Sequence, residues 1–193
     1  MDNDEELLAR SATDPASFEP LVERHSAALY AYLARRLPGA AEDLLSDVWL
    51  AAYAGRATFD PERGPARGWL FGIARNAVVT HLRRPVALPL GYGSADGQGW
   101  DDVDDRLDAQ RRAPALYAAI RDLPDTEREL LLLVALDGLT PTEAGAALGI
   151  PAGTARSRLH RARARIREQL DTDEPAPAAP TPLTARLTPG ALA

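Results

Sequence analysis

A glycine-, proline- and aspartate-rich stretch in the middle of the chain, Pro85 to Asp105, divides the sequence into two blocks. It contains four glycines, two prolines, five aspartates and no basic residue, a composition that predicts a flexible, solvated linker. The blocks on either side place apolar residues at helical spacing, and neither shows the alternating pattern typical of a sheet. The sequence therefore predicts an all-α protein with two small helical domains joined by a flexible acidic linker.

This division gives four predicted parts. Residues 1–84 form the first helical domain, residues 85–105 the linker, residues 106–170 the second helical domain and residues 171–193 a tail. Five prolines and few large apolar side chains interrupt the alanine-rich tail, which predicts disorder.

The first block is predicted to contain three helices. The first begins at Asp14-Pro15, where an aspartate N-cap precedes a proline suited to the first turn. A second helix is expected from about Ala41, and a third over about Ala66 to Arg84, with Leu82 among its buried residues. The third helix carries four arginines and no acidic residue, so it is locally basic within a protein of net charge −6.

The second block carries the pattern of a helix-turn-helix. After a turn at Leu123-Pro124, the run Thr126 to Glu129 predicts a capping box. Thr140-Pro-Thr-Glu143 predicts a second capping box with proline at the first helical position, and Gly149-Ile150-Pro151 predicts the turn that follows. The next helix has six arginines and no acid from Ala155 to Arg167. Two short helices with a glycine-containing turn and a basic second helix are typical of DNA recognition.

Residues in the first half of that basic helix are the candidates for reading base edges, because this half of a recognition helix enters the major groove. These candidates are Arg156, Ser157, His160 and Arg161. Three further arginines are expected on phosphates: Arg158, Arg163 and Arg167. The alternative, a merely solvated surface, is disfavoured because such surfaces mix acidic with basic residues.

Composition argues against several other classes of protein. The chain has no cysteine and only three scattered histidines, so we expect no disulfide, no metal and no cofactor. No apolar run reaches the roughly 20 residues of a membrane span, and the acidic start of the chain does not fit a signal peptide, which favours a cytoplasmic protein without membrane insertion. Since no phosphate loop or nucleophile with a base is evident, we expect no enzyme and no catalytic residue.

Three motifs in order around the linker give a family resemblance. Ala41-Glu-Asp-Leu-Leu-Ser-Asp-Val-Trp-Leu50 resembles region 2.2 of the sigma-70 family, and Trp69-Leu-Phe-Gly-Ile-Ala-Arg-Asn76 resembles its regions 2.3 and 2.4. Thr154-Ala-Arg-Ser-Arg-Leu-His-Arg-Ala-Arg163 resembles region 4.2. The chain is thus similar, from Phe18 to Leu170, to the extracytoplasmic-function sigma factors of bacterial RNA polymerase. The resemblance implies a sigma region 2-like bundle before the linker and a region 4-like helix-turn-helix after it.

The same resemblance implies site residues in the first domain. Polymerase-binding residues would be Glu42, Asp43, Asp47 and Trp49, although an acidic helix surface and a core tryptophan are alternatives. The minus-10 promoter element would be bound by Arg67, Arg75, Asn76, Arg83 and Arg84, with an ordinary surface hydrogen bond as the alternative for Asn76. The basic helix of the second domain would bind the minus-35 element.

The implied function is that of a sigma factor, which directs promoter-specific initiation with core polymerase and promoter DNA as partners and, in many members, an anti-sigma factor. Two other classes stay open. A helix-turn-helix regulator would bind duplex DNA without acting as a sigma subunit, and an adaptor that sequesters a partner protein would show no salt-dependent DNA affinity.

Overall fold

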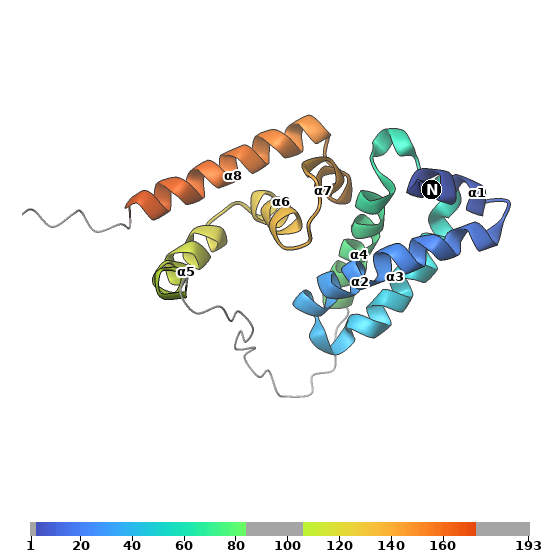
Figure 1. Cartoon of the computed structure of the whole chain (residues 1–193), viewed down its shortest axis with the longest axis horizontal. Helices are drawn as coiled ribbons and strands as arrows, with labels where there is room; N and C mark the ends of the chain where they lie inside the picture. Colours follow the sequence, from blue (N-terminus) through green and yellow to red (C-terminus); the bar gives the residue numbers. More distant parts are fainter. Residues whose placement is uncertain (1–2, 84–105, 173–193) are drawn as a thin grey trace, which may run out of the picture.

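The computed structural model describes residues 3–83 and 106–172, and these ranges contain helices and no strand. Figure 1 shows the helices in two groups, α1 to α4 and α5 to α8. The first group comprises α1 (Asp4–Ser11), η1 (Pro15–Phe18), α2 (Glu19–Arg36), η2 (Pro38–Ala40), α3 (Ala41–Gly55), η3 (Arg56–Thr58), η4 (Pro61–Arg63) and α4 (Ala66–Arg83), where η denotes a 3₁₀ helix. The second comprises α5 (Arg106–Arg121), α6 (Asp125–Ala135), α7 (Pro141–Leu148) and α8 (Ala152–Thr172). The all-α prediction is confirmed, whereas the predicted linker, Arg84 and residues 173–193 lie outside the described residues.

Helix α1 is hydrogen-bonded to α2 and to the start of α4. The Asp4 carboxylate accepts a hydrogen bond from Arg24 Nη1 at 2.8 Å and lies 2.6 Å from His25 Nε2. Glu5 Oε1 accepts a hydrogen bond of 2.9 Å from the backbone amide of Ala66, the first residue of α4. The first amides of a helix have no carbonyl partner within that helix, so the Glu5 carboxylate of α1 caps the N-terminus of α4.

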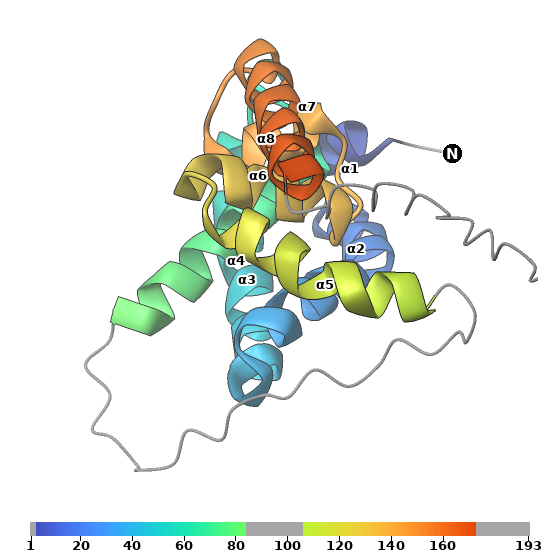
Figure 2. The same ribbon diagram turned by 90° about the vertical axis from the view of Figure 1, so that its left-hand side faces the viewer.

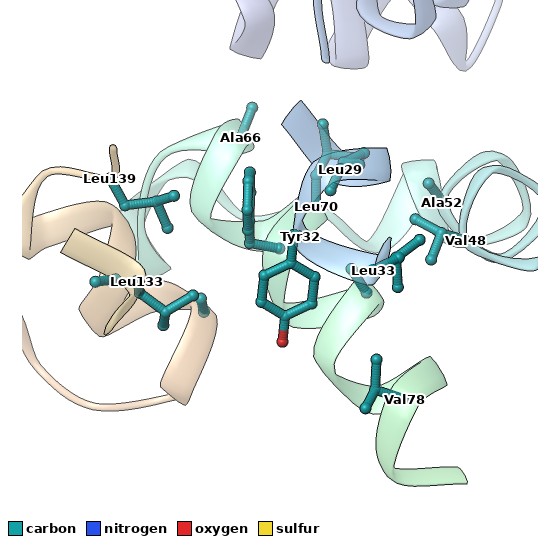
Figure 3. Packing of buried hydrophobic residues seen from close by; sticks show 14 of the residues in the cluster. Leu29, Tyr32, Leu33, Val48, Ala52, Ala66, Leu70, Val78, Leu133 and Leu139 are labelled. Carbon is teal, nitrogen blue, oxygen red and sulfur yellow. The ribbon is translucent and has the colours of Figure 1, made fainter. Parts of the chain in front are cut away.

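The hydrophobic core runs without interruption from the first group of helices into the second. Leu133 and Leu139 belong to the same buried cluster as Tyr32 and Ala66 (Figure 3). Burial raises the pKa of Tyr32 to about 12, so its phenol stays neutral at ordinary pH. The two helical groups are therefore packed against each other.

Figure 2 shows α7 and α8 stacked at one end of the molecule, with α5 crossing beneath them. Helix α4 packs more extensively against α7 than any other described pair of elements does against each other. This contact joins a helix of the first group to the first helix of the predicted helix-turn-helix. It therefore determines which sides of α4 and α7 remain exposed to solvent.

Three expectations from the sequence were wrong. The first block has an additional helix, α1, whose capping box joins Asn3 and Glu6. Helix α6 begins at Asp125 after Pro124 and has no side-chain cap, so the predicted box at Thr126 does not form. Leu82 is 66 % exposed, because it lies in the last turn of α4, beyond the neighbouring helices.

The Asp4 contacts predict a pH-dependent contribution to stability. Burial alone would raise the pKa of Asp4, but the hydrogen bonds from Arg24 and His25 outweigh it and lower that pKa below its usual value. A lowered pKa means that the stabilisation is present above the unfolded pKa of about 4 and is lost as the pH falls through the folded pKa. Asp4→Asn should therefore lower the free energy of unfolding by about 1–2 kcal/mol at pH 7 and by much less at pH 3.

Urea denaturation of the wild-type protein and the variant at both pH values measures this difference. Glu23→Gln, which neutralises an exposed carboxylate of α2, is the matched control and should change stability little at either pH. An equal loss for Asp4→Asn at pH 3 and pH 7 would contradict the electrostatic explanation.

Candidate nucleic-acid interface

The capping box predicted at the start of α7 is present. Thr140 Oγ1 accepts a hydrogen bond of 3.2 Å from the Glu143 amide, and Glu143 Oε2 accepts one of 2.6 Å from the Thr140 amide. At the other end, Gly149 adopts the left-handed conformation, with φ 67° and ψ 30°, and terminates the helix. Both ends of this short helix are therefore defined by local sequence.

A glycine lets α7 and α8 approach closely. A Cβ atom at Gly145 would lie 3.0 Å from Ala155 Cβ and 3.1 Å from the Ile150 carbonyl oxygen. The Ile150 amide donates a hydrogen bond of 2.9 Å to the Gly145 carbonyl and closes the turn. Helices α7 and α8 with this tight turn form the predicted helix-turn-helix (Figure 1).

Helix α8 presents a basic surface to solvent. Its apolar side is buried at Ala155, Leu159 and Ala162. The predicted DNA-contacting residues on its other sides are exposed, except Arg158, which is partly buried: Arg156, Ser157, His160, Arg161, Arg163 and Arg167. The structure thus brings six of the seven predicted residues onto open surface.

Two arginines of α8 also make contacts within the second group of helices. Arg156 Nη2 donates a hydrogen bond of 3.2 Å to Thr142 Oγ1 on α7. Arg165 pairs with the largely buried Glu127 of α6 at 2.6 Å. Arg165 is therefore held by a largely buried partner on α6, whereas Arg156 stays exposed despite its contact with Thr142.

The predicted residues of α4 separate into two sets. Asn76 and Arg83 are exposed. Arg67 and Arg75 instead reach the second group of helices: Arg67 donates to the carbonyl oxygens of Gly138 at 3.0 Å and Asp137 at 3.1 Å. Arg75 Nε donates to Glu129 Oε1 at 2.7 Å, and this hydrogen bond raises the pKa of Arg75.

The loop before α4 encloses a hollow together with the helix-turn-helix. Phe59 packs on Trp69, with ring centroids 5.5 Å apart, and Asp60 caps the short η4 helix by accepting a hydrogen bond from the Glu62 amide. A cavity of about 620 Å³ lies beside these rings, and Ala146, Gly149, Ile150 and Pro151 form its opposite wall.

Helix α3 has an exposed acidic side that also carries apolar residues. Glu42, Asp43 and Asp47 are exposed, as predicted for a docking surface. Leu50, which is 69 % exposed, and Tyr53 lie near this side at helical spacing, and neither was predicted as a site residue. The signal was available, because residues 43, 47 and 50 follow the i, i+4, i+7 spacing of one helix side.

Trp49 is half-buried between α2 and α3. Its ring packs edge-on against Phe18, with centroids 5.9 Å apart, and its Nε1 donates a hydrogen bond of 3.1 Å to Ser26 Oγ on α2. These contacts describe a packing role for Trp49 between α2 and α3.

Among the described residues, no group of histidines and carboxylates is arranged to hold a metal ion. Over the same part of the chain, none of the helices combines the length and apolar character needed to cross a membrane.

Comparison with known proteins agrees with the geometry of both helical groups. The family model for sigma-70 region 2 matches residues 21–85, and the model for sigma-70 region 4 matches residues 114–166. The extracytoplasmic-function sigma factor SigM of Mycobacterium tuberculosis is 33 % identical over 166 residues, covering 85 % of this chain and 82 % of SigM. The chain belongs to the extracytoplasmic-function sigma factors of the sigma-70 family.

Other relatives of this chain are also sigma factors. CnrH of Cupriavidus metallidurans is 31 % identical over 186 residues, covering 89 % of this chain and 96 % of CnrH. The match to SigE of Mycolicibacterium smegmatis is 33 % identical over 163 residues and covers 80 % of this chain but 62 % of SigE.

Solved structures share the fold. The structure of CnrH in complex with the cytosolic domain of CnrY has a TM-score of 0.56 and 30 % identity, covering 89 % of this chain and 99 % of CnrH. RpoE in complex with the anti-sigma factor NepR from Bartonella quintana has a TM-score of 0.52, 24 % identity and coverage of 81 % and 98 %, which supports the fold alone. A sigma factor is a regulatory subunit that directs RNA polymerase to promoters, and this is the function of the chain.

Proposed function

We propose that each described surface of this sigma factor serves one step of initiation. The acidic side of α3, with Glu42, Asp43 and Asp47, would bind core polymerase. Helix α4 and the loop before it would bind the minus-10 element, and α8 would bind the minus-35 element. Residues 1–84 and 106–170 would act as the two binding domains, in the cytoplasm where the polymerase works.

The exposed basic surface of α8 is the observation that carries this proposal. Four exposed residues lie within a narrow sector of the helix: Arg156, His160, Arg163 and Arg167. Gly145 allows α8 to pack closely on α7, and Gly149 ends α7 before the turn. Guanidinium groups on such a helix suit guanine edges and phosphates. The proposal needs no catalytic residue or cofactor, since the chemistry of transcription belongs to the core enzyme.

An anti-sigma factor is a further proposed partner. RpoE, similar in fold, was crystallised with the anti-sigma factor NepR. An inhibitor of this kind would have to cover the α3 or α8 surface to prevent initiation.

Run-off transcription from host genomic fragments tests the proposed function. Purified core polymerase with this protein should give discrete new start sites that core polymerase alone does not give. If the protein yields no new start but by itself footprints duplex DNA, a helix-turn-helix regulator is the better explanation.

Base reading by α8 is tested by substitution. Arg156→Ala or Arg161→Ala should cost about 1–3 kcal/mol at the minus-35 element of a promoter found by run-off and relax preference at one base pair. Arg163→Ala is the matched control for a phosphate contact, and it should weaken all sequences alike and reduce the salt slope by about one. Competition binding with single-base variants of the promoter measures the difference. An equal loss of affinity of Arg156→Ala for all base variants would instead indicate that Arg156 contacts phosphates.

Polymerase docking by α3 is tested at its exposed leucine. Leu50→Ala removes exposed apolar surface one turn beyond Asp47 and should weaken binding to core polymerase by about tenfold, which corresponds to about 1.4 kcal/mol. Leu82→Ala makes the same chemical change at a leucine of similar exposure on α4 and should leave the affinity unchanged. Titration of labelled protein with core polymerase in the absence of DNA gives both values, and equal affinities for the two variants would refute a role for Leu50.

A further inference from the structure

A groove lies between α5 and the last turns of α8. Figure 1 shows the end of α8 beside α5, and the two helices pack against each other. The groove has a volume of about 480 Å³. Ala115, Ala118 and Leu123 line one wall, and Glu168 and Gln169 of α8 line the other. Clefts of several hundred Å³ are large enough to hold a small ligand or the side chains of a short peptide segment.

The floor of this groove is apolar and its rim is partly acidic. Ala119 and Leu123 are buried, whereas the side chain of Asp122 is 56 % exposed. Glu168 is exposed on the α8 side of the groove. Arg165 also lies on the rim, where it already pairs with Glu127. A complementary occupant therefore combines apolar side chains for the floor with a basic side chain for the rim.

The groove opens on a side of α8 that faces away from its basic sector. With 3.6 residues per turn, Arg165 and Gln169 lie roughly half a turn around the helix from Arg156 and His160. A segment bound in the groove therefore leaves the proposed DNA-contacting residues of α8 uncovered.

The end of the chain is long enough to reach the groove. Residues 173–193 follow Thr172, the last residue of α8. Along the helix axis, Arg165 lies only about 10 Å from Thr172. The ten residues 173–182 span about 16 Å as a flexible chain and about 31 Å as an extended polyproline helix. Either length allows a segment that begins at residue 183 to fold back onto the α5–α8 groove.

The sequence of residues 183–187, Leu-Thr-Ala-Arg-Leu, fits this groove in its chemistry. Leu183 and Leu187 are four residues apart, so a single helical turn would place both on the same side. Thr181-Pro182 precedes them and repeats the Thr140-Pro141 start of α7, where threonine caps the helix and proline occupies its first position. Arg186 is the only basic residue in the sequence after α8.

We infer that residues 183–187 dock in the α5–α8 groove, with the two leucines on its floor and Arg186 at its acidic rim. Because the segment belongs to the same chain, its effective concentration at the groove is on the order of millimolar, which is enough to populate a weak contact. A tail that cannot build a core of its own would thus become ordered locally on contact. The inference goes beyond the proposed function, since neither the groove nor the segment contains a residue proposed to bind DNA or polymerase.

Disulfide formation between the groove and the segment tests the inference. The chain has no cysteine, so Ala118→Cys combined with Thr184→Cys introduces a single pair. Ala164→Cys combined with Thr184→Cys is the matched control, because Ala164 is exposed on α8 near the tail but does not line the groove. In a glutathione buffer, the Ala118 pair should oxidise at least about tenfold faster than the Ala164 pair. Adding Leu183→Ser and Leu187→Ser should remove this difference.

Two outcomes of the cross-linking would overturn the inference. Equal oxidation rates for the two pairs would mean that the segment does not prefer the groove. Disulfide-linked dimers from the Ala118 pair would mean that the segment of a second copy occupies it. Absence of run-off transcription by the wild-type protein would refute the proposed function and would leave these rates unaffected.

Hydrogen exchange of the cysteine-free, full-length protein gives an independent measurement. Leu183→Ser combined with Leu187→Ser should speed exchange of the amides of residues 115–123 by about threefold or more, because a docked segment stabilises that part of the fold. Leu192→Ser makes the same chemical change in the tail outside the segment and should leave exchange unchanged. Equal protection in the wild-type protein and both variants would overturn the inference even if the cysteine variants failed to fold.

Discussion

The close approach of α4 to α7 organises the rest of the molecule. Glu5 of α1 caps the start of α4. Helices α2 and α3 cover part of α4, and the side that they leave uncovered packs against α7. Because Gly68 has no side chain, that side of α4 can contact the backbone of α7, and Gly64, just before α4, leaves room for Ala146. Buried residues of both helical groups then join into a single core, to which Tyr32, Ala66, Leu133 and Leu139 belong.

The same packing explains why the arginines of α4 differ in exposure. Arg83 lies near the free end of α4 and is exposed, whereas Arg67 and Arg75 lie beside the glycines and are drawn into the contact. On α8, the apolar side is buried within its own group of helices, so most of its arginines are exposed; Arg158 is partly buried, and Arg165 pairs with Glu127. The arginines of this sigma factor are therefore divided between those that make contacts within the fold and those that form an exposed basic surface on α8.

Local sequence predicted those parts of the fold that depend on neighbouring residues. Thr140 and Glu143 are three residues apart and cap the same helix, and the buried residues of α8 follow from helical spacing alone. Helix α1 was not predicted, although Asn3 and Glu6 have the spacing of a capping box. Leu82 was wrongly predicted to be buried, because helical spacing cannot show where the neighbouring helices end. The contact of Arg75 with Glu129 joins residues 54 positions apart, and no periodicity within one block reveals such a pairing.

The glycines of α4 carry a consequence for how this chain tolerates mutation. Alanine at a helical glycine stabilises an isolated helix, so Gly68→Ala favours the helix itself while it pushes α7 away. A side chain at position 68 would therefore exchange the packing between the two helical groups for the stability of α4 alone.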